Sequence, residues 1–290
     1  MTRKPFAILG ATGYIGSSFV ALLKRESLPF VAFSRHDAAD SERLRAALER
    51  ANAGCLINAA GFTGKPNVDA CEDRKSDCLL GNAVLPGIIR SACEAIDLPW
   101  GHVSSGCIYT GRRTDGKGFS EADPPNFSFR QNNCSFYSGT KALGEEVLAE
   151  APRCYVWRLR IPFDNRANPR NYLYKLLNYR MLLEAENSLS HRDEFVRACV
   201  DCFRMGVPYG TYNLTNPGSV WTRDVTELML ASGITAKVFE FFADEAEFMQ
   251  RAAKAPRSNC VLDSSKAIAA GLKLTPIIPA LQQTLARWEA

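Results

Sequence analysis

Three glycines near the beginning of the chain, in Gly10-Ala-Thr-Gly13-Tyr-Ile-Gly16, constrain the fold more than any other feature. An apolar run, 6–10, precedes them, and residues 16–24 have the apolar spacing of a helix. Glycine keeps such a strand-to-helix turn tight and lets the backbone approach a pyrophosphate, which the N–H groups at the start of the helix would bind. The context predicts a dinucleotide-binding turn made of Gly10, Thr12, Gly13, Tyr14, Ile15 and Gly16.

The first half of the chain alternates apolar runs with helical periodicity, which is typical of successive βαβ units on a parallel sheet. Predicted strands cover 6–10, 30–34, 55–59, 100–104 and 155–159, and predicted helices cover 16–24, 41–50, 84–96 and 137–150. Residues 168–171 are predicted to open a helix that runs to about 183. A helix over 193–205, a strand over 210–215 and a terminal helix ending near Trp288 follow.

We therefore predict an α/β fold with a doubly wound parallel sheet of the Rossmann type. Residues 1–164 are expected to form the dinucleotide-binding domain, and segments near 188–215 would complete its sheet. Residues 165–290 would mainly form a smaller C-terminal substrate-binding lobe. This lobe would lie over the carboxyl ends of the strands, where such sheets bind ligands.

Composition argues against several classes of protein. The chain is 46% hydrophobic, as globular proteins are, and its net charge of +4 is not gathered in a basic run that would suggest nucleic-acid binding. No stretch reaches the roughly 18 consecutive apolar residues of a membrane helix. Ten scattered cysteines fit free thiols in a reducing compartment. We expect a soluble cytoplasmic protein with no membrane or nucleic-acid partner.

The sequence also gives no reason to expect a metal site. Cys199 and Cys202 have C-x-x-C spacing, but no second pair accompanies them and they fall within a predicted helix. The three histidines, His36, His102 and His191, form no ligand pattern. The dinucleotide is therefore the cofactor that the sequence predicts.

The end of the second predicted strand indicates which dinucleotide binds. An NAD-binding protein usually has an acidic residue there for the ribose 2′-hydroxyl, whereas this chain has Ser34-Arg35-His36. Because an arginine can pair with a 2′-phosphate, Ser34 and Arg35 favour NADP(H). The alternative is that Arg35 is merely an exposed side chain.

A second motif carries candidate acid–base chemistry. Tyr137 and Lys141 are four residues apart in a predicted helix, so they lie on one face of it. A cation beside a phenol is expected to lower the pKa of the tyrosine, which would let it donate a proton to a carbonyl near neutral pH. Ser104 and Ser105 end a predicted strand about 30 residues earlier and could contribute a hydroxyl. The pair is common by chance alone, but it is specific in combination with the glycine turn.

Together, the glycine turn, Asn58-Ala-Ala-Gly61, the two serines, Tyr137 and Lys141 resemble the extended short-chain dehydrogenase/reductase family. Further segments are similar to the bifunctional 3,5-epimerase/4-reductases of nucleotide-rhamnose synthesis and, more distantly, to dTDP-4-dehydrorhamnose reductases. The resemblance extends from about residue 6 to the terminal helix. The segments that carry it are 58–72, Gly106-Cys-Ile-Tyr109, Pro125-Asn-Phe127, Ser135-Phe-Tyr-Ser138, Asn168-Pro-Arg-Asn171, 212–218 and Ala255-Pro-Arg-Ser-Asn259.

The resemblance implies roles for individual residues. Tyr137 would donate a proton to the C4 carbonyl, and Lys141 would hold the nicotinamide ribose. Ser105, in place of the usual Thr of this branch, would polarise the carbonyl. The adenosine side of the cofactor would be lined by Asn58, Ala59 and Ala60.

Cys107 and Lys175 separate the bifunctional branch from a plain reductase. In the branch that this chain resembles, a cysteine in Gly-Cys-Ile and a lysine after Asn-Pro-Arg-Asn act as acid and base for epimerisation. The 4-keto group acidifies the neighbouring protons, so such a pair could invert C3 and C5 through an enolate. The alternatives are a small buried residue for Cys107 and a solvated helix position for Lys175.

Four further residues are candidates for binding the substrate. Arg257 matches a position that the family uses near the nucleotide diphosphate, and a planar guanidinium suits phosphate. Its alternative is a surface arginine in a loop. The weaker candidates are Lys65, Asn67 and Arg170.

The resemblance implies an NADPH-dependent enzyme that epimerises a nucleotide-linked 4-keto-6-deoxy-glucose at C3 and C5 and then reduces C4, giving a nucleotide-L-rhamnose or a close relative. A monofunctional reductase or epimerase on a related keto sugar is the first alternative. A non-catalytic NADP-binding subunit is the second, although such a subunit has no reason to keep Ser105, Tyr137 and Lys141 together. A homodimer is a reasonable expectation.

Overall fold

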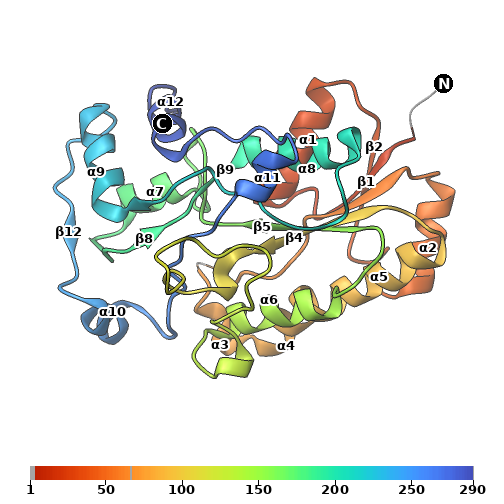
Figure 1. Cartoon of the computed structure of the whole chain (residues 1–290), viewed down its shortest axis with the longest axis horizontal. Coiled ribbons are helices and arrows are strands. Elements are labelled where there is room, and N and C mark those ends of the chain that lie inside the picture. Colours follow the sequence, from red (N-terminus) through yellow and green to blue (C-terminus); the bar gives the residue numbers. More distant parts are fainter. Residues whose placement is uncertain (1–3, 66, 290) are drawn as a thin grey trace.

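A six-stranded parallel sheet forms the centre of the molecule (Figure 1). The structure is a computed structural model that describes residues 4–65 and 67–289. The strand order is β10-β5-β4-β3-β1-β2, so the chain reverses its direction of progress across the sheet between β1 and β3. The strands are β1 (Phe6–Leu9), β2 (Phe30–Phe33), β3 (Cys55–Asn58), β4 (Trp100–Ser105), β5 (Cys154–Leu159) and β10 (Gly210–Asn213).

Helices cover both faces of this sheet, as its two-sided apolar strands require. One core packs Ile8, Ile57 and Trp157 against α1 and α8. The other packs Ala7, Leu9 and neighbouring residues against α2 and α5 on the opposite face. In Figure 1, α1 and α8 lie above the sheet, and α2, α5 and α6 lie below it. These helices are α1 (Tyr14–Arg25), α2 (Ser41–Arg50), α5 (Leu85–Ala95), α6 (Phe136–Val147) and α8 (Arg192–Met205).

A smaller lobe lies at the left of Figure 1, beyond the carboxyl ends of the strands. Its core gathers Phe163, Leu173, Leu189, Met229 and Leu281. Three two-stranded pairs stiffen the lobe and its junction with the sheet: β6 (Pro162–Phe163) with β9 (Ser190–His191), β7 (Met181–Leu182) with β12 (Glu240–Phe241), and β8 (Glu186–Asn187) with β11 (Val220–Trp221). The helices of this part of the chain are α7 (Tyr172–Asn178), α9 (Thr222–Ala231), α10 (Glu245–Ala252), α11 (Ser265–Ala269) and α12 (Ile277–Leu285). Of these, α11 packs against β10 of the main sheet.

The predicted fold class, a doubly wound parallel α/β sheet, is confirmed. One predicted helix was too long: the helix after Asn171 ends at Asn178, and Met181–Leu182 forms β7 instead of a last helical turn. The apolar spacing continues past Asn178, but Met181 and Leu182 pair with β12 as a strand. Short elements that the sequence pattern did not predict include α3 (Ala70–Asp73), α4 (Lys75–Leu79) and a π-helix, Leu80–Val84.

Within residues 4–65 and 67–289, no helix is long and apolar enough to cross a membrane. In the same residues, no group of three or more His, Cys, Asp or Glu side chains could hold a metal ion. Cys199 and Cys202 belong to α8, and their thiols are buried in the core.

Candidate active site

The glycine-rich turn has a shape that only glycine permits. Gly10 has φ +80°, and a Cβ there would lie 2.6 Å from the amide nitrogen of Ala60. A Cβ on Gly16 would lie 1.9 Å from the carbonyl oxygen of Gly10. Because α1 starts at Tyr14, directly after Gly13, its first N–H groups face this closely packed turn. A dinucleotide pyrophosphate fits such a cradle of bare backbone.

The residues predicted to select between the two dinucleotides lie at the end of β2. Ser34 and Arg35 are exposed there. The backbone N–H and the hydroxyl of Ser34 both donate to Asp37 Oδ2, at 2.8 and 2.7 Å. These hydrogen bonds lower the pKa of Asp37. This carboxylate was not predicted as a site residue, because it stands three residues beyond the position that the acidic residue usually occupies.

A cleft of about 1170 Å³ opens at the carboxyl edge of the sheet and continues into the lobe. Most of the predicted site residues line it together, although they are dispersed over the sequence. Gly10, Gly16, Ser34, Arg35 and Asn58 are not among its lining residues. The predicted residues that line it are Thr12, Gly13, Tyr14, Ile15, Ala59, Ala60, Lys65, Asn67, Ser105, Cys107, Tyr137, Lys141, Arg170, Lys175 and Arg257.

Asn58 lies beneath the cleft and has no exposed surface. Its Oδ1 accepts a hydrogen bond from the N–H of Ala60 at 3.0 Å, and its Nδ2 lies 2.9 Å from Nδ1 of His102. The Asn58 side chain therefore supports the loop after β3 by a hydrogen bond, and Ala59 and Ala60 line the cleft where a cofactor would contact them.

Ser105, Tyr137 and Lys141 come from the end of β4 and the first turns of α6. Ser135 caps α6, since its hydroxyl accepts a hydrogen bond from the N–H of Ser138 at 3.2 Å. Lys141 is buried, and its Nζ donates to the carbonyl of Val103 at 3.2 Å. This contact holds the ammonium at the base of the cleft, against β4.

The expected lowering of the Tyr137 pKa was wrong. Burial raises the pKa of the Tyr137 phenol well above its ordinary value, and the nearby Ser105 hydroxyl opposes only part of that shift. Burial also lowers the pKa of Lys141. The spacing of Tyr137 and Lys141 correctly placed both residues on one face of α6. It could not predict how strongly Tyr137 is desolvated, because that depends on the packing of α6 against β4 and the π-helix.

A buried polar network supports this part of the site. The hydroxyl of Ser104 donates to Glu145 Oε1 at 2.5 Å, and Arg158 Nη2 lies 2.8 Å from Glu145 Oε2. Both members of the ion pair are nearly inaccessible to solvent. The end of β4 is thus tied to α6 and β5 directly behind the predicted catalytic residues.

Cys107 and Lys175 approach the cleft from different elements. Cys107 follows β4 in a short 3₁₀ turn and is buried, and burial raises the pKa of its thiol. Lys175 is half-buried on α7, and burial, assisted by the charge of Arg170, lowers the pKa of its ammonium. A protonated thiol and a neutral amine are the forms that an acid and a base need, so each shift favours the required form.

Arg160 is a cleft residue that the sequence analysis missed. It is 5% exposed, donates from Nη2 to Asn187 Oδ1 at 2.5 Å, and has a buried Nε without a hydrogen-bond partner among the described residues. Its charge counteracts the effect of burial on the pKa of Cys107. The signal was present in the sequence, because Arg158 lies within an otherwise apolar strand and Arg160 directly follows it.

The predicted substrate residues lie around the mouth of the cleft. Arg170 donates to the Thr63 hydroxyl at 2.8 Å and to the Gly64 carbonyl at 2.7 Å, so it joins the segment before α7 to the loop after β3. Lys65 is exposed on that loop. The side chain of Asn67 accepts a hydrogen bond from the N–H of Asp69 at 2.9 Å. Arg257 is paired with the carboxylate of Asp69.

Comparisons with known proteins agree with this geometry. Residues 5–289 match the family described as RmlD substrate binding domain. A bifunctional dTDP-4-dehydrorhamnose 3,5-epimerase/dTDP-4-dehydrorhamnose reductase of Arabidopsis thaliana is 31% identical over 269 residues, covering 90% of this chain and 85% of the relative.

A second relative is longer. A trifunctional UDP-glucose 4,6-dehydratase/UDP-4-keto-6-deoxy-D-glucose 3,5-epimerase/UDP-4-keto-L-rhamnose-reductase of Arabidopsis thaliana is 32% identical over 266 residues. The match covers 90% of this chain but only 39% of that protein, so the chain corresponds to one part of it.

Among solved structures, the UDP-rhamnose synthase of Acanthamoeba polyphaga mimivirus superposes with a TM-score of 0.90. It covers 98% of this chain and 99% of its own, at 23% identity, which is a likeness of fold. The family match spans nearly the whole chain and agrees with the sheet order, the glycine turn and the Tyr137–Lys141 helix. The chain belongs to the RmlD family of the extended short-chain dehydrogenases/reductases.

Proposed function

We propose that this protein is a bifunctional enzyme that epimerises a nucleotide-linked 4-keto-6-deoxy-glucose at C3 and C5 and reduces the product at C4 with NADPH. The observation that carries the proposal is the presence of Cys107 and Lys175 in the same cleft as Ser105, Tyr137 and Lys141. A reductase needs only the last three residues. The relative with epimerase and reductase activities in its name, at 31% identity, supports the same assignment.

For epimerisation, the neutral amine of Lys175 removes a proton from the carbon next to the C4 carbonyl. The electrons of the broken C–H bond pass to the carbonyl oxygen, and the hydroxyls of Ser105 and Tyr137 stabilise this enolate by hydrogen bonds. Inversion requires that the new proton arrive from the opposite face of the ring, and the thiol of Cys107 supplies it. The resulting thiolate and ammonium exchange protons with water before the next turnover.

For reduction, the 4-keto group must lie within hydrogen-bond reach of Tyr137 and Ser105. NADPH, when bound on the glycine turn, supplies the hydride to C4. Tyr137 gives its proton to the carbonyl oxygen as the alcohol forms, and the Lys141 ammonium stabilises the phenolate that this transfer leaves. Because burial raises the pKa of Tyr137, the phenol stays protonated until a substrate carbonyl is present to accept the proton.

The preference for NADPH is part of the proposal. Arg35 is exposed at the end of β2, where a 2′-phosphate of the cofactor would lie. The carboxylate of Asp37 would repel that phosphate, but it already accepts two hydrogen bonds from Ser34. Arg35 therefore supplies the attraction, and Ser34 holds the acidic group in place.

Two assays test the proposal. The purified protein is first incubated with UDP- or dTDP-4-keto-6-deoxy-glucose and NADPH, and the sugar product is identified by NMR. The keto sugar is then incubated in D₂O without NADPH, and deuterium at C3 and C5 is measured. We expect a nucleotide-L-rhamnose in the first assay and incorporation of deuterium in the second.

The variants Cys107→Ala and Lys175→Ala should reduce the deuterium exchange, and Cys107→Ala should still reduce a 4-keto sugar that already has the L-configuration. Some loss of reduction is expected, because both sites act on one bound ketone. If the parent protein shows no exchange but reduces the pre-epimerised sugar, the bifunctional proposal is wrong and a plain reductase remains. If neither activity is found while NADPH binds, the alternative is a non-catalytic subunit.

A further inference from the structure

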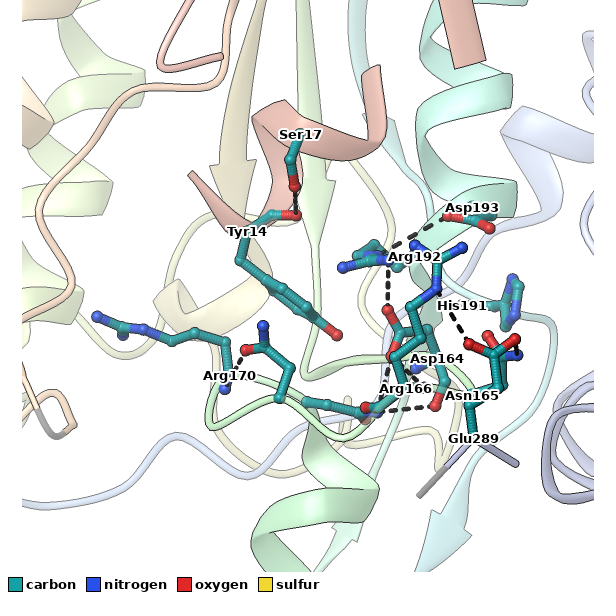
Figure 2. Close-up of polar contacts among 12 residues, drawn as sticks. Tyr14, Ser17, Asp164, Asn165, Arg166, Arg170, His191, Arg192, Asp193 and Glu289 are labelled. Carbon is teal, nitrogen blue, oxygen red and sulfur yellow. Dashed lines mark hydrogen bonds and ion pairs between the residues drawn. The ribbon is translucent and has the colours of Figure 1, made fainter. Parts of the chain in front are cut away.

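A buried ion pair joins the cofactor turn to the helix that carries Lys175. Asp164 directly follows β6 and Arg192 directly follows β9, and these two strands pair in parallel with Phe163 opposite His191. The pairing brings Arg192 Nη2 to 2.6 Å from Asp164 Oδ2. Asp164 is 1% exposed and Arg192 is 5% exposed. Figure 2 shows the two side chains facing each other between α1 and the lobe.

The location of Arg192 is unfavourable for its own helix. Arg192 is the first residue of α8, where the positive end of the helix dipole disfavours a cation. Burying the ion pair also costs desolvation energy, so such a pair is weak evidence for a contribution to stability. Residues that break a local rule without stabilising the fold are expected where a site must be held in one geometry.

One side of the pair contacts the cofactor turn. The guanidinium carbon of Arg192 lies 4.5 Å from the centroid of the Tyr14 ring. Tyr14 is the first residue of α1 and belongs to the glycine turn. Figure 2 shows its ring reaching down from α1 toward Arg192 and Asp164. The pair is therefore packed directly against the surface that is proposed to bind the cofactor.

The other side of the pair fixes the beginning of α7. Asn171 is fully buried, and its Nδ2 donates to the carbonyl oxygen and to Oδ1 of Asp164, both at 2.8 Å. Asn171 is also the N-cap of α7, because its Oδ1 accepts a hydrogen bond from the N–H of Leu173 at 3.1 Å. The N–H of Lys175 donates to the carbonyl of Asn171 at 3.0 Å. Lys175 is thus one helical turn from a cap that Asp164 holds.

A helix of this length depends on such external support. α7 has seven residues, and isolated helices so short are unstable in water. At its other end, the ammonium of Lys237 donates to the carbonyls of Leu176 and Leu177, both at 3.0 Å, and to that of Tyr179 at 2.5 Å. Side chains from elsewhere in the chain therefore hold both ends of α7, and the Asp164–Arg192 pair is the support that also contacts the cofactor turn.

We propose that Asp164, Asn171 and Arg192 are positioning residues that fix Lys175 relative to the cofactor turn, so that the base of the epimerisation and the reducing site act on one bound sugar. This inference rests on the proposed function, because it assigns a purpose to the placement of Lys175. It predicts that loss of the ion pair impairs proton abstraction far more than reduction.

The test compares Arg192→Met and the double variant Asp164→Asn/Arg192→Met with a matched control, Arg197→Met. The double variant removes both charges and leaves no unpaired ion in the core. Arg197 lies five residues further along α8, and its Nη1 is 2.6 Å from Glu26 Oε1, beyond the end of α1. The control therefore removes an ion pair that also begins on α8, but one that joins α8 to the end of α1 and does not reach α7.

In the parent, the control and the double variant, deuterium exchange into the 4-keto sugar and reduction of the pre-epimerised sugar are measured across pH. Displacement of a reacting group by about 1 Å costs on the order of 100-fold, so exchange in the double variant should fall by that factor while reduction changes little. The rising limb of the exchange profile should also move to higher pH, because Lys175 becomes more hydrated and its pKa rises toward the ordinary value. Arg170 is the charged group that lowers the Lys175 pKa together with burial, and it is unchanged in these variants.

A second readout does not depend on catalysis. Acylation of the Lys175 amine by acetic anhydride is followed by mass spectrometry across pH, which reports its pKa directly. We expect a higher pKa in Arg192→Met and in the double variant than in the parent and Arg197→Met.

The outcomes separate the inference from the function on which it rests. If the folded double variant, by circular dichroism, has the parental acylation profile, the positioning inference is overturned even where exchange is seen. Parallel loss of exchange and reduction without movement of the pH limb also overturns it. If the parent shows no exchange but the acylation profile shifts in the variants, the epimerase proposal fails and the placement of Lys175 by the ion pair stands.

Discussion

Arg257 and Asp69 form a bidentate ion pair across the mouth of the cleft, with Nη1 and Nη2 at 2.7 and 2.6 Å from the two carboxylate oxygens. Nη1 also donates to the carbonyl of Ala255 at 3.0 Å. A guanidinium has five N–H donors, so three are engaged and two remain for a phosphate. Burial alone would raise the pKa of Asp69, but Arg257, together with backbone hydrogen bonds from Lys254 and Ala255, more than offsets it and the pKa is lowered. The pair therefore presents Arg257 in a fixed orientation.

This relationship predicts the effect of Arg257→Met on substrate affinity. A hydrogen bond to a charged group contributes about 1.5–3 kcal/mol, so KM for the nucleotide sugar should rise by roughly 10- to 150-fold. The kcat should change little, because the diphosphate is remote from C4. The control is Lys254→Met, which removes a solvent-exposed pair with Asp73 and should leave KM near the parental value. Steady-state kinetics check this, and an unchanged KM in Arg257→Met would place the diphosphate elsewhere.

The end of β2 predicts selectivity between cofactors. Arg35→Ala should weaken the binding of NADPH by about 1.5–3 kcal/mol, because it removes a charge-assisted contact with the 2′-phosphate. The affinity for NADH should stay nearly unchanged. Asp37→Asn is the matched variant, because it removes the nearby negative charge. It should not lower the affinity for NADPH. Dissociation constants by fluorescence titration measure both effects. An equal loss of affinity for the two cofactors in Arg35→Ala would contradict the role of Arg35.

The phenol of Tyr137 predicts a separation of binding from chemistry. Tyr137→Phe should lower the rate of reduction by about 10²–10⁴, which is the usual contribution of a positioned general acid, with NADPH affinity nearly intact. Single-turnover oxidation of NADPH by the pre-epimerised sugar gives the rate. A variant that reacts at close to the parental rate would mean that another group donates the proton.

Lys175 and Cys107 predict a bell-shaped pH profile for deuterium exchange. Exchange should rise with pH through a pKa below the ordinary 10.5 of lysine, because only the neutral amine accepts a proton and burial lowers the pKa of Lys175. It should fall through a pKa above the ordinary 9.0 of a thiol, because burial raises the pKa of Cys107 and only the protonated thiol donates. Lys175→Arg keeps the charge but cannot lose its proton near neutral pH, so exchange should drop by about 10²–10⁴ while reduction persists. A rate that does not vary with pH would exclude this pair.

The glycine turn predicts a graded effect on stability. In Gly16→Ala the new methyl would lie 1.9 Å from the carbonyl oxygen of Gly10, whereas in Gly13→Ala it would lie 3.2 Å from the same atom. Gly16→Ala should therefore lower the free energy of unfolding by about 1–3 kcal/mol or more, as overpacking does. Gly13→Ala should lower it by less. Urea denaturation without cofactor measures both. Equal stability of the two variants would contradict the close approach of Gly16 to Gly10.

The sequence by itself determined the sheet and the local motifs. Alternating apolar runs and helical spacing depend on neighbouring residues alone, and they placed β1, α2 and β4 within a residue of their observed bounds. The glycine turn and the Tyr137–Lys141 face are also local patterns. The resemblance to a known branch then singled out Cys107 and Lys175, which no local pattern distinguishes from a buried thiol and a solvated lysine.

Only the tertiary structure decided the electrostatics and the supports of the site. The high pKa of Tyr137 results from desolvation by segments far apart in the chain, so a cation four residues away was a poor guide to it. The helix that carries Lys175 ends at Asn178 because the next residues pair with β12, about 60 positions later. The Asp164–Arg192 pair depends on the pairing of β6 with β9. Burial and long-range pairing arise only when the chain is folded, and they decide which charges meet and which protons the cleft can move.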